Sequence, residues 1–437
     1  MTTEQPRQLP LDGVRVLAQA IVWAGPFGSM ILADLGAEVI EVESIHHISP
    51  TRGSYRHMPP QLMDGPAGAI YLDRDGSEGF WDRNSGFNFA KRGHKSVTVD
   101  LASDEGRELF FGLVREADVF VENNAADVVD NLGISWETLS EINPRLIMVR
   151  FPGFGISGPY EHFKGFGATM ESVIGHTMLR GYRDSDPSQT PAIYHGDPNA
   201  GAHVATAVQI ALIARERTGE GQLIEMSQAE AVIHHTSYDL IDYQMNQRTH
   251  AHWGNRHPSM APYGVFRCAG DDRWLALAVP SDEVFARLCE VMGQPELAND
   301  ERFADAAARY GHQDELEPLV EAWTSQHGDD ELMHRLQAAG VPAAVVAHQA
   351  EMFDDPHLRA RGFFIEVEHP VAGVRRHPGP MAKFERMPLT PVRGPAPTLG
   401  QHNEEVLLGI LGISRERYDE LERDQVIGTV YTEDAGA

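Results

Sequence analysis

The chain has 437 residues, of which 42% are hydrophobic and 23% are charged, the composition of a folded globular protein of about two or three domains. Asp and Glu number 64 against 36 Lys and Arg, so the formal net charge is −28 at pH 7. A surface this acidic repels duplex phosphate and anionic lipid, so we expect neither a nucleic-acid nor a membrane partner. Cys268 and Cys289 are the only cysteines, too few for a disulfide framework or a four-thiolate zinc site.

No segment has the pattern of a membrane span or a secretory signal. The longest apolar stretch, residues 204–214, is interrupted by Thr206 and Gln209 and is shorter than the roughly 20 residues that cross a bilayer. The first residues lack a basic region followed by an apolar one. These features and the scarcity of cysteine predict a cytoplasmic protein.

The first part of the chain alternates short apolar strands with helices. Strands are predicted at residues 14–18, 37–43, 96–101, 118–122 and 145–151, and helices at 27–35 and around 108–116. This alternation predicts a large, doubly wound α/β domain with a parallel sheet. Residues 44–87 break the pattern with four prolines and many glycines. So long a loop either borders a functional site or is a disordered surface excursion.

The later part indicates a second domain. Helices are predicted at 199–217 and 228–247, and a polar hinge follows at Gly254-Asn255. A hairpin at 265–267 and 274–279 precedes helices up to about residue 339, and a strand at 363–367 returns to the first domain. We predict that the large domain comprises 1–228 and 341–437, with a linker helix at 229–250 and a small α+β domain at 251–340.

Asp197 stands out within residues 194–201, Tyr-His-Gly-Asp-Pro-Asn-Ala-Gly. A carboxylate on a glycine turn at a helix start is close to free backbone N–H groups, which could hold a reacting oxygen. Alternatively, Asp197 is an N-cap with Pro198 at the first helical position. His195, Asp197 and His203 lack a second group of ligands at metal-binding spacing, so we predict no metal site.

Lysine occurs only at positions 91, 95, 164 and 383, and positive charge is concentrated in residues 91–95. On so acidic a chain, Lys91 and Arg92 could bind a phosphorylated ligand, although a solvated turn is the alternative. Residues 25–28, Gly-Pro-Phe-Gly, follow a strand but lack the three glycines of a dinucleotide-binding turn. Neither a phosphate-binding Gly-Lys-Ser/Thr loop nor a Gly-x-Ser-x-Gly nucleophile turn is present.

Taken together and in order, a dozen short segments resemble the family III CoA-transferases over roughly residues 9–412. They are residues 11–17 (LDGVRVL), 24–27 (AGPF), 33–40 (ADLGAEVI), 95–101 (KSVTVDL), 117–119 (ADV), 143–147 (NPRLI), 153–155 (GFG), 196–197 (GD), 218–222 (TGEGQ), 261–264 (APYG), 340–343 (GVPA) and 399–402 (LGQH).

This resemblance implies that Asp197 is a covalent catalyst that moves CoA from an acyl-CoA thioester to a small carboxylic acid. Only a carboxylate nucleophile can become the acyl half of an aspartyl-CoA thioester. Gly196 and Gly201 would support the turn and its oxyanion-binding N–H groups. The resemblance places CoA contacts at Val22, Trp23, Ala24, Asn123 and Lys164. It implies no tightly bound cofactor, because the CoA ester is itself the substrate.

The chain also departs from the family pattern. Many relatives carry a basic residue in the strand that here reads Glu41-Val42-Glu43, and arginines where Ser44 and Asn131 stand. Lys91, Arg92 or Arg83 would have to substitute for them, or CoA is held more loosely.

Two alternative functions stay open. Racemases of the same superfamily pair the aspartate with a histidine shortly after the position of Lys164, where this chain has Gly165-Phe166-Gly167. Phe166 cannot transfer a proton, which disfavours racemisation, although His176 lies nearby in the sequence. The other alternative is a non-catalytic partner subunit of a heteromeric CoA-transferase, against which the retained Asp197 argues.

The resemblance further implies an open-ring subunit that interlocks with a second copy to form a homodimer. Apolar surface around residues 204–214 would then be buried by the second chain.

Overall fold

The computed structural model describes residues 9–182, 184–249, 252–387 and 392–435, which fall into two compact units. The larger unit comprises Met1–Ile174, Ala192–Tyr238 and Ala360–Ala437, and the smaller comprises Gly175–Pro191 and Asp239–Arg359. The return to the larger unit thus begins at Ala360, whereas we expected it at residue 341. The difference arises because β9 (Ala343–Val345) pairs with β8 in the sheet of the smaller unit.

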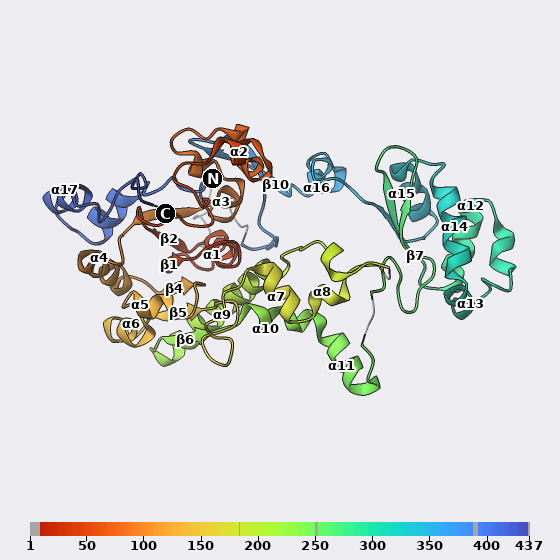
Figure 1. The fold of residues 1–437 in the computed structure, drawn as a ribbon, viewed down its shortest axis with the longest axis horizontal. Coiled ribbons are helices and arrows are strands. Elements are labelled where there is room, and N and C mark those ends of the chain that lie inside the picture. Colours follow the sequence, from red (N-terminus) through yellow and green to blue (C-terminus); the bar gives the residue numbers. More distant parts are fainter. Residues whose placement is uncertain (1–8, 183, 250–251, 388–391, 436–437) are drawn as a thin grey trace, which may run out of the picture. The chain divides into compact units, whose positions relative to one another are not determined.

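The larger unit contains a six-stranded sheet in the order β3-β2-β1-β4-β5-β6, with every neighbouring pair parallel (Figure 1). The strands are β1 (Arg15–Gln19), β2 (Glu38–Glu43), β3 (His94–Thr98), β4 (Val119–Glu122), β5 (Ile147–Arg150) and β6 (Gln222–Glu225). Val16 pairs with Val39 on one side and Val119 on the other, so β1 is central. The direction of winding changes between β1 and β4, and in open parallel sheets ligands bind outside the carboxyl ends of the strands at such a point.

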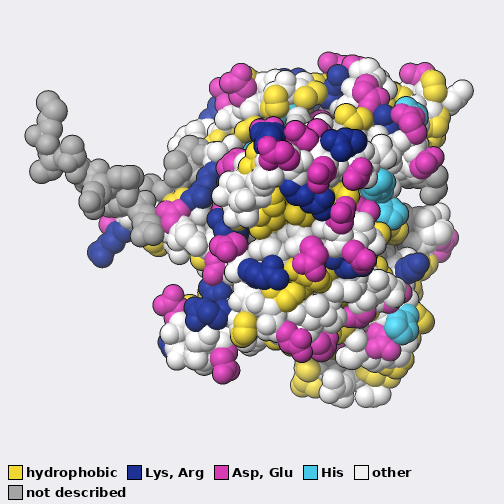
Figure 2. All heavy atoms as spheres, turned by 90° about the vertical axis from the view of Figure 1, so that its left-hand side faces the viewer, with side chains coloured by type: hydrophobic (Ala, Val, Ile, Leu, Met, Phe, Trp, Pro, Cys, Tyr) yellow, Lys and Arg dark blue, Asp and Glu magenta, His cyan; other side chains and the backbone are white. Residues whose placement is uncertain are grey.

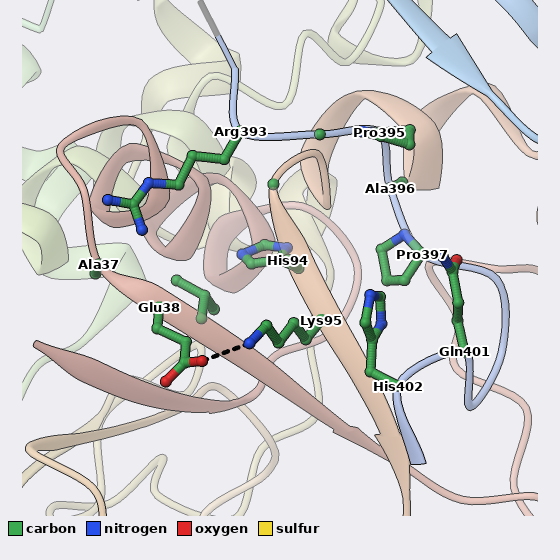
Figure 3. Close-up of a pocket in the computed structure, with 13 residues that line it drawn as sticks. Ala37, Glu38, His94, Lys95, Arg393, Pro395, Ala396, Pro397, Gln401 and His402 are labelled. Atoms are coloured by element: carbon green, nitrogen blue, oxygen red, sulfur yellow. Dashed lines mark hydrogen bonds and ion pairs between the residues drawn. The ribbon is translucent and has the colours of Figure 1, made fainter. Parts of the chain in front are cut away.

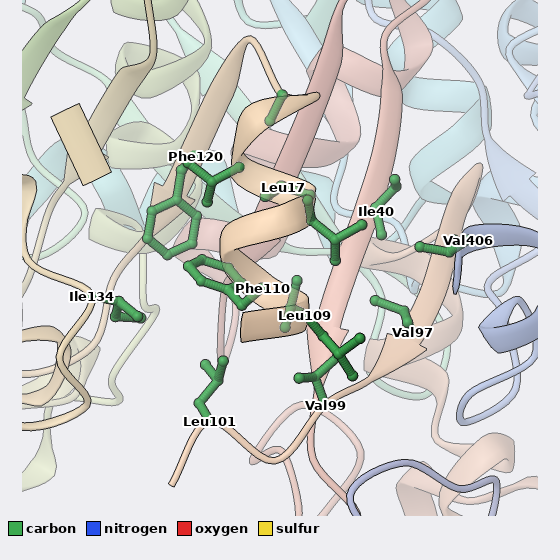
Figure 4. Close-up of a cluster of buried hydrophobic side chains, with 14 of the residues drawn as sticks. Leu17, Ile40, Val97, Val99, Leu101, Leu109, Phe110, Phe120, Ile134 and Val406 are labelled. Carbon is green, nitrogen blue, oxygen red and sulfur yellow. The ribbon is translucent and has the colours of Figure 1, made fainter. Parts of the chain in front are cut away.

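Helices cover both faces of this sheet because alternate strand residues point to opposite sides. Val16 and Ala18 face a core shared with α1 (Ala24–Asp34) and α9 (Gly196–Thr218), whereas Leu17 faces a core shared with α4 (Asp104–Arg115). In this second core Phe110 of α4 meets Phe120 of β4 edge to face at 5.3 Å (Figure 4). Burying each such side chain contributes about 1.5–3 kcal/mol. The prediction of an α/β fold with a parallel sheet is confirmed.

The C-terminal segment completes the second core. Val406 and Leu407 belong to a π-helical segment, Glu405–Ile410, and Leu421 belongs to α17 (Arg415–Arg423); all three are fully buried there. The other α-helices and strands of the larger unit are α2 (Pro60–Asp64), α3 (Ser85–Ala90), α5 (Val128–Asn131), α6 (Trp136–Ile142), α7 (Gly167–Val173), α10 (Gln228–Ile233), β10 (Phe364–His369) and β11 (Gly373–Pro378).

The long segment 44–87 is ordered and packed, so its interpretation as a disordered excursion is wrong. Trp81 and Tyr71 lie in a buried cluster with Tyr431 from the C-terminal segment. Arg52, which is fully buried, binds Glu43 at 2.6 Å and Asp82 at 2.5 Å. The pair with Glu43 attaches this segment to the carboxyl end of β2, and the pair with Asp82 joins two parts of the segment to each other.

The smaller unit is α+β. Its antiparallel sheet has β8 (Trp274–Ala278) between β7 (Tyr263–Arg267) and β9, so the hairpin expected at 265–267 and 274–279 is present. Its helices include α8 (His176–Leu179), α11 (Ser237–Asn246), α12 (Asp282–Met292), α13 (Ala306–Gly311), α14 (Gln313–Thr324) and α15 (Asp329–Ala338), and α16 (Pro356–Ala360) ends at the boundary of the two units. The single helix expected at 228–247 is instead α10 and α11 separated by a 3-10 turn, η5 (His234–Thr236).

Charge is mixed on the surface of the face seen in Figure 2, where acidic side chains alternate with Lys and Arg. In the larger unit, Arg417 of α17 forms an ion pair with Glu105 of α4 at 2.9 Å. No helix among the described residues is long and apolar enough to cross a bilayer.

Candidate active site

Asp197 is the second residue of α9, and its side chain is almost entirely buried, with the residue 6% exposed. The N-cap is His195, which makes no capping hydrogen bond from its side chain. The alternative in which Asp197 caps the helix is therefore wrong: the helix begins one residue before it. Asp197 instead lies in the first turn, where the helix dipole favours negative charge. In this turn the Asp197 N–H donates to the Tyr194 carbonyl at 3.3 Å, and the Asn199 N–H donates to the His195 carbonyl at 3.4 Å.

The first residue of α7 approaches the Asp197 carboxylate closely. A Cβ atom on Gly167 would lie 2.7 Å from Oδ2 of Asp197, so only glycine leaves room for this carboxylate. Glu171, one turn further along α7, is fully buried. Burial and, secondarily, the negative charge of Glu171 raise the pKa of Asp197 to about 6. The carboxylate is still mainly ionised at neutral pH, but it is more basic than an ordinary aspartate.

Two residues with left-handed backbone conformation stand before the helices of the site. Tyr194 has φ of +52° just before the His195 N-cap, and Val22 has φ of +61° just before α1. Such angles are costly for non-glycine residues, above all for a β-branched one, and such strain is concentrated at functional sites. The first turn is held by the His195 N–H, which donates to Oε1 of Glu171 at 2.8 Å.

The two glycines predicted to support the turn have different surroundings. A Cβ on Gly196 would lie 2.8 Å from Cγ2 of Val232, and one on Gly201 would lie 2.6 Å from the carbonyl oxygen of Ala24. Gly201 therefore serves the close packing of α9 on α1, where Gly28 is its counterpart. Its contact with Ala24 joins the N-terminal end of α1 to the first two turns of α9.

The predicted CoA contacts at Val22, Trp23 and Ala24 occupy the turn into α1. Asn123, which follows β4, holds this turn in place. Its Oδ1 accepts from the Ile21 N–H at 2.8 Å, and its Nδ2 donates to the Ile21 carbonyl at 3.0 Å. The fold thus brings this turn, Asn123 and the first turns of α9 into one contiguous region.

Lys91 and Arg92 lie elsewhere than expected. Lys91 is fully buried and pairs with Glu41 at 2.5 Å, while Arg92 is buried and pairs with Asp34 at 2.7 Å. This arrangement weighs against both as direct phosphate ligands, and it excludes the alternative of a solvated turn. Lys164 is exposed and forms no ion pair with a described residue.

A cavity of about 500 Å³ opens at the carboxyl ends of β1, β2 and β4 and beside the segment that follows β3. Ser44 and Asn131 line it, as do Glu41, Glu43 and His47, and among its described lining residues none is Lys or Arg. Residues 47–50 of the long segment form part of its wall. Sequence reasoning indicated that this segment borders a site but did not reveal the cavity; Arg83, a possible substitute cation, is paired with Asp75 at 2.5 Å.

A second cavity, of about 320 Å³, lies at the opposite, amino-terminal ends of β2 and β3 (Figure 3). Its charged groups are already paired: Lys95 contacts Glu38 at 2.5 Å, and Arg393 contacts Asp12. Because this cavity lies at the amino-terminal ends of the strands, it is separate from the region around Asp197.

The structure also locates the two residues that bear on the racemase alternative, Phe166 and His176. Phe166, where racemases carry their histidine, is the exposed N-cap of α7, and His176 begins α8 in the smaller unit. Among the described residues no cluster of three or more His, Cys, Asp or Glu could hold a metal ion.

Comparison with known proteins decides the family, because the model of CoA-transferase family III matches residues 11–403. The chain belongs to CoA-transferase family III. It is 34% identical to a succinyl-CoA–D-citramalate CoA-transferase of Chloroflexus aurantiacus, over 98% of this chain and 100% of that protein. It is 33% identical to a succinate–glutarate CoA-transferase of Agrobacterium fabrum, over 95% of this chain and 99% of that protein.

A solved structure supports the same assignment. A CaiB/BaiF family protein from Brucella suis is 32% identical and superposes with a TM-score of 0.80, covering 92% of this chain and 100% of that one. The strongest candidate for a reactive group in this structure is the carboxylate of Asp197, which is buried at the start of α9 and has a raised pKa.

Proposed function

We propose that Asp197 is the nucleophile of a CoA transfer from an acyl-CoA to a carboxylic acid. One carboxylate oxygen attacks the thioester carbon, the C–S bond breaks and CoA leaves as the thiolate, which gives a mixed anhydride. The thiolate attacks Cγ of Asp197, the donor acid leaves as its carboxylate, and an aspartyl-CoA thioester remains. The acceptor carboxylate then attacks Cγ, and the released thiolate attacks the acceptor's acyl carbon, which restores Asp197.

The observation that carries this proposal is the environment of the carboxylate. No proton is gained or lost in any of these steps, so the reaction needs a basic, ionised carboxylate and stabilisation of the oxyanions. Burial beside Glu171 supplies the basicity. The positive end of the α9 dipole, at the helix start that carries Asp197, would stabilise the oxyanions.

We further propose that the nucleotide part of CoA occupies the cavity of about 500 Å³ and that the pantetheine arm runs past residues 22–24 towards Asp197. Its position at the change of winding supports this placement. Ser44, Asn124 and Asn131 would supply neutral hydrogen-bond donors there, and Lys164 would supply positive charge nearer to Asp197.

The test is to trap the aspartyl intermediate. The protein is incubated with succinyl-CoA, treated with hydroxylamine or borohydride, and analysed by peptide mass spectrometry. Modification confined to Asp197 in the wild type is expected, while Asp197→Asn should lose transfer by at least about 1,000-fold and remain unmodified. Asp104→Asn, in the exposed first turn of α4, is the control. Full activity of Asp197→Asn would exclude this mechanism.

Racemisation receives no support from Phe166, whose ring offers no acid or base. Assaying the purified chain alone, with a panel of acyl-CoAs and free acids, separates an active enzyme from a non-catalytic partner subunit. Because both relatives described above are named for dicarboxylic acids, we include succinate, glutarate and D-citramalate in that panel.

We also propose that two copies interlock as a homodimer in the cytoplasm. One face of α9, with Val204 and Val208, is buried in the sheet core, while the other exposes Ile210 and Ile213 to 63% and 56%. A second chain would bury these side chains. Sizing should give about twice 48.3 kDa at nanomolar concentration, and tagged and untagged dimers should not exchange over hours. A monomer on dilution would rule the arrangement out.

A further inference from the structure

A strained tyrosine stands just before the helix that carries the nucleophile. Tyr194 has φ of +52°, in the left-handed region that favours glycine or asparagine. A bulky residue persists there only where its surroundings determine its conformation, and such positions are concentrated at functional sites. The proposed transfer mechanism gives Tyr194 no part, so its conformation needs an explanation of its own.

Hydrogen bonds fix the backbone around Tyr194. Its carbonyl accepts from the Asp197 N–H at 3.3 Å. The N–H of the next residue, His195, donates to Oε1 of Glu171 at 2.8 Å, and Glu171 is fully buried in α7. Two helices of the larger unit, α7 and α9, therefore hold this tyrosine in its left-handed conformation.

The side chain of Tyr194 meets the nucleophile at Gly167, the first residue of α7. A Cβ atom on Gly167 would lie 2.7 Å from Oδ2 of Asp197, 2.9 Å from Cδ1 of Tyr194 and 3.3 Å from Cβ of Tyr194. The aromatic ring and the carboxylate thus approach one point, and the missing side chain at Gly167 makes room for both. Asp197 is 6% exposed and Tyr194 is 47% exposed, so the ring lies at the boundary between the buried carboxylate and solvent.

The proposed reaction gives an apolar group at this boundary a use. The aspartyl-CoA thioester reacts with water, which is far more concentrated than any acceptor acid. In that side reaction a water oxygen attacks Cγ of Asp197, the C–S bond breaks and CoA leaves as the thiolate. One proton of the water goes to the thiolate and the other to solvent, so Asp197 and free CoA are regenerated without transfer. Sites that exclude water suppress such reactions.

We propose that the Tyr194 ring shields the acylated Asp197 from water and thereby commits the enzyme to transfer rather than hydrolysis. The inference rests on the proposed function and adds to it the residue that protects its intermediate. The direction of the Cα–Cβ bond depends on φ, so the left-handed backbone is what brings this ring to Gly167. Shielding needs the aromatic ring and not the phenol hydroxyl.

The experiment measures hydrolysis in the absence of an acceptor acid. An equimolar amount of succinyl-CoA is added in water labelled with heavy oxygen, and the label in the Asp197 peptide is followed by mass spectrometry. Water attack on Cγ labels Asp197, whereas hydrolysis of the ester in solution labels only succinate. Tyr194→Ala should label Asp197 at least about tenfold faster than the wild type, and Tyr194→Phe within about twofold of it. Tyr55→Ala, at another exposed tyrosine, is the matched control.

A further variant separates the ring from the strained backbone. Tyr194→Gly removes the ring but adopts positive φ without strain, so it should unfold at a higher temperature than Tyr194→Ala and yet label Asp197 equally fast. It also replaces the alanine variant if that one fails to fold.

Three results would overturn the proposal. They are a wild-type rate of labelling in a folded Tyr194→Ala or Tyr194→Gly protein, labelling and transfer that fall together in these variants, and a Tyr194→Phe protein that is labelled as fast as Tyr194→Ala. Failure of the transfer mechanism has a different signature, because hydroxylamine would then leave Asp197 of the wild type unmodified.

Discussion

Gly201 of α9 lies against Ala24 of α1 so closely that a Cβ atom on Gly201 would be 2.6 Å from the Ala24 carbonyl oxygen. The contact is between backbones, which cannot move apart as the tip of a side chain can. It ties the turn into α1, with its strained Val22, to the helix that carries Asp197.

Gly201→Ala should therefore weaken both the fold and the site. Overpacking of a close backbone contact costs about 1–3 kcal/mol, and the displaced α1 turn should raise the KM for acyl-CoA. Urea unfolding and steady-state kinetics measure the two effects. Gly409→Ala, at a glycine with open space around its Cβ position, is the control. Wild-type stability of the Gly201 variant would contradict this role.

Asp197→Asn should make the protein more stable at neutral pH. A carboxyl whose pKa rises from 3.8 to about 6 on folding destabilises the folded state at pH 7 by about 3 kcal/mol. The destabilisation is absent below the unfolded pKa and grows as the pH rises towards the folded one. The difference in unfolding free energy between Asn variant and wild type should thus be larger at about pH 8 than at about pH 5. If the Asn variant were less stable than the wild type at both pH values, this prediction would be refuted.

The acid side of the pH–rate profile should report the same carboxyl. Transfer should decline as the pH falls through about 6, because protonated Asp197 cannot attack the thioester. Glu171→Gln removes a negative charge that raises the pKa of Asp197, while the amide can still accept from the His195 N–H. This variant should shift the decline to lower pH; an unmoved profile would show that Glu171 has no electrostatic influence on Asp197.

Lys164→Ala should raise the KM for acyl-CoA several-fold and reduce the dependence of KM on salt, because an exposed lysine meets an anionic ligand. Lys383→Ala is the control at another exposed lysine. If the Lys164 variant keeps the wild-type KM and salt dependence, CoA does not contact this residue.

Asn131→Arg should tighten CoA binding. The cavity at the carboxyl ends of the strands has Glu41, Glu43 and Asp100 in its wall and no Lys or Arg among its described lining residues. A guanidinium there would meet a CoA phosphate with charge-assisted hydrogen bonds and lower the KM about three- to tenfold. Asn131→Gln, which adds length without charge, should have no such effect. A KM that is unchanged by arginine would place the phosphates outside this cavity.

The parallel sheet could be predicted because its strands are short apolar runs separated by helices, and both patterns are local. The position of Asp197 at the start of a helix was also predictable from Gly-Asp-Pro. The environment of Lys91 and Arg92 was not, since the ion pairs that draw them inward involve Glu41 and Asp34, more than forty residues away. The role of Gly201 likewise depends on Ala24 and Gly28 in another helix. Sequence spacing along one segment contains no information about such partners.

The path of the chain also has a consequence for biosynthesis. Fully buried Leu407 and Leu421 come from the last segment of the larger unit, and buried Asn403 accepts from the Thr98 N–H at 2.8 Å and donates to its hydroxyl at 3.0 Å. Strand β3 and the core beneath α4 therefore lack these partners until the chain has been synthesised beyond residue 421. The smaller unit, whose main segment Asp239–Arg359 leaves the ribosome earlier, can fold first, and a premature stop after it would leave the sheet of the larger unit exposed to aggregation.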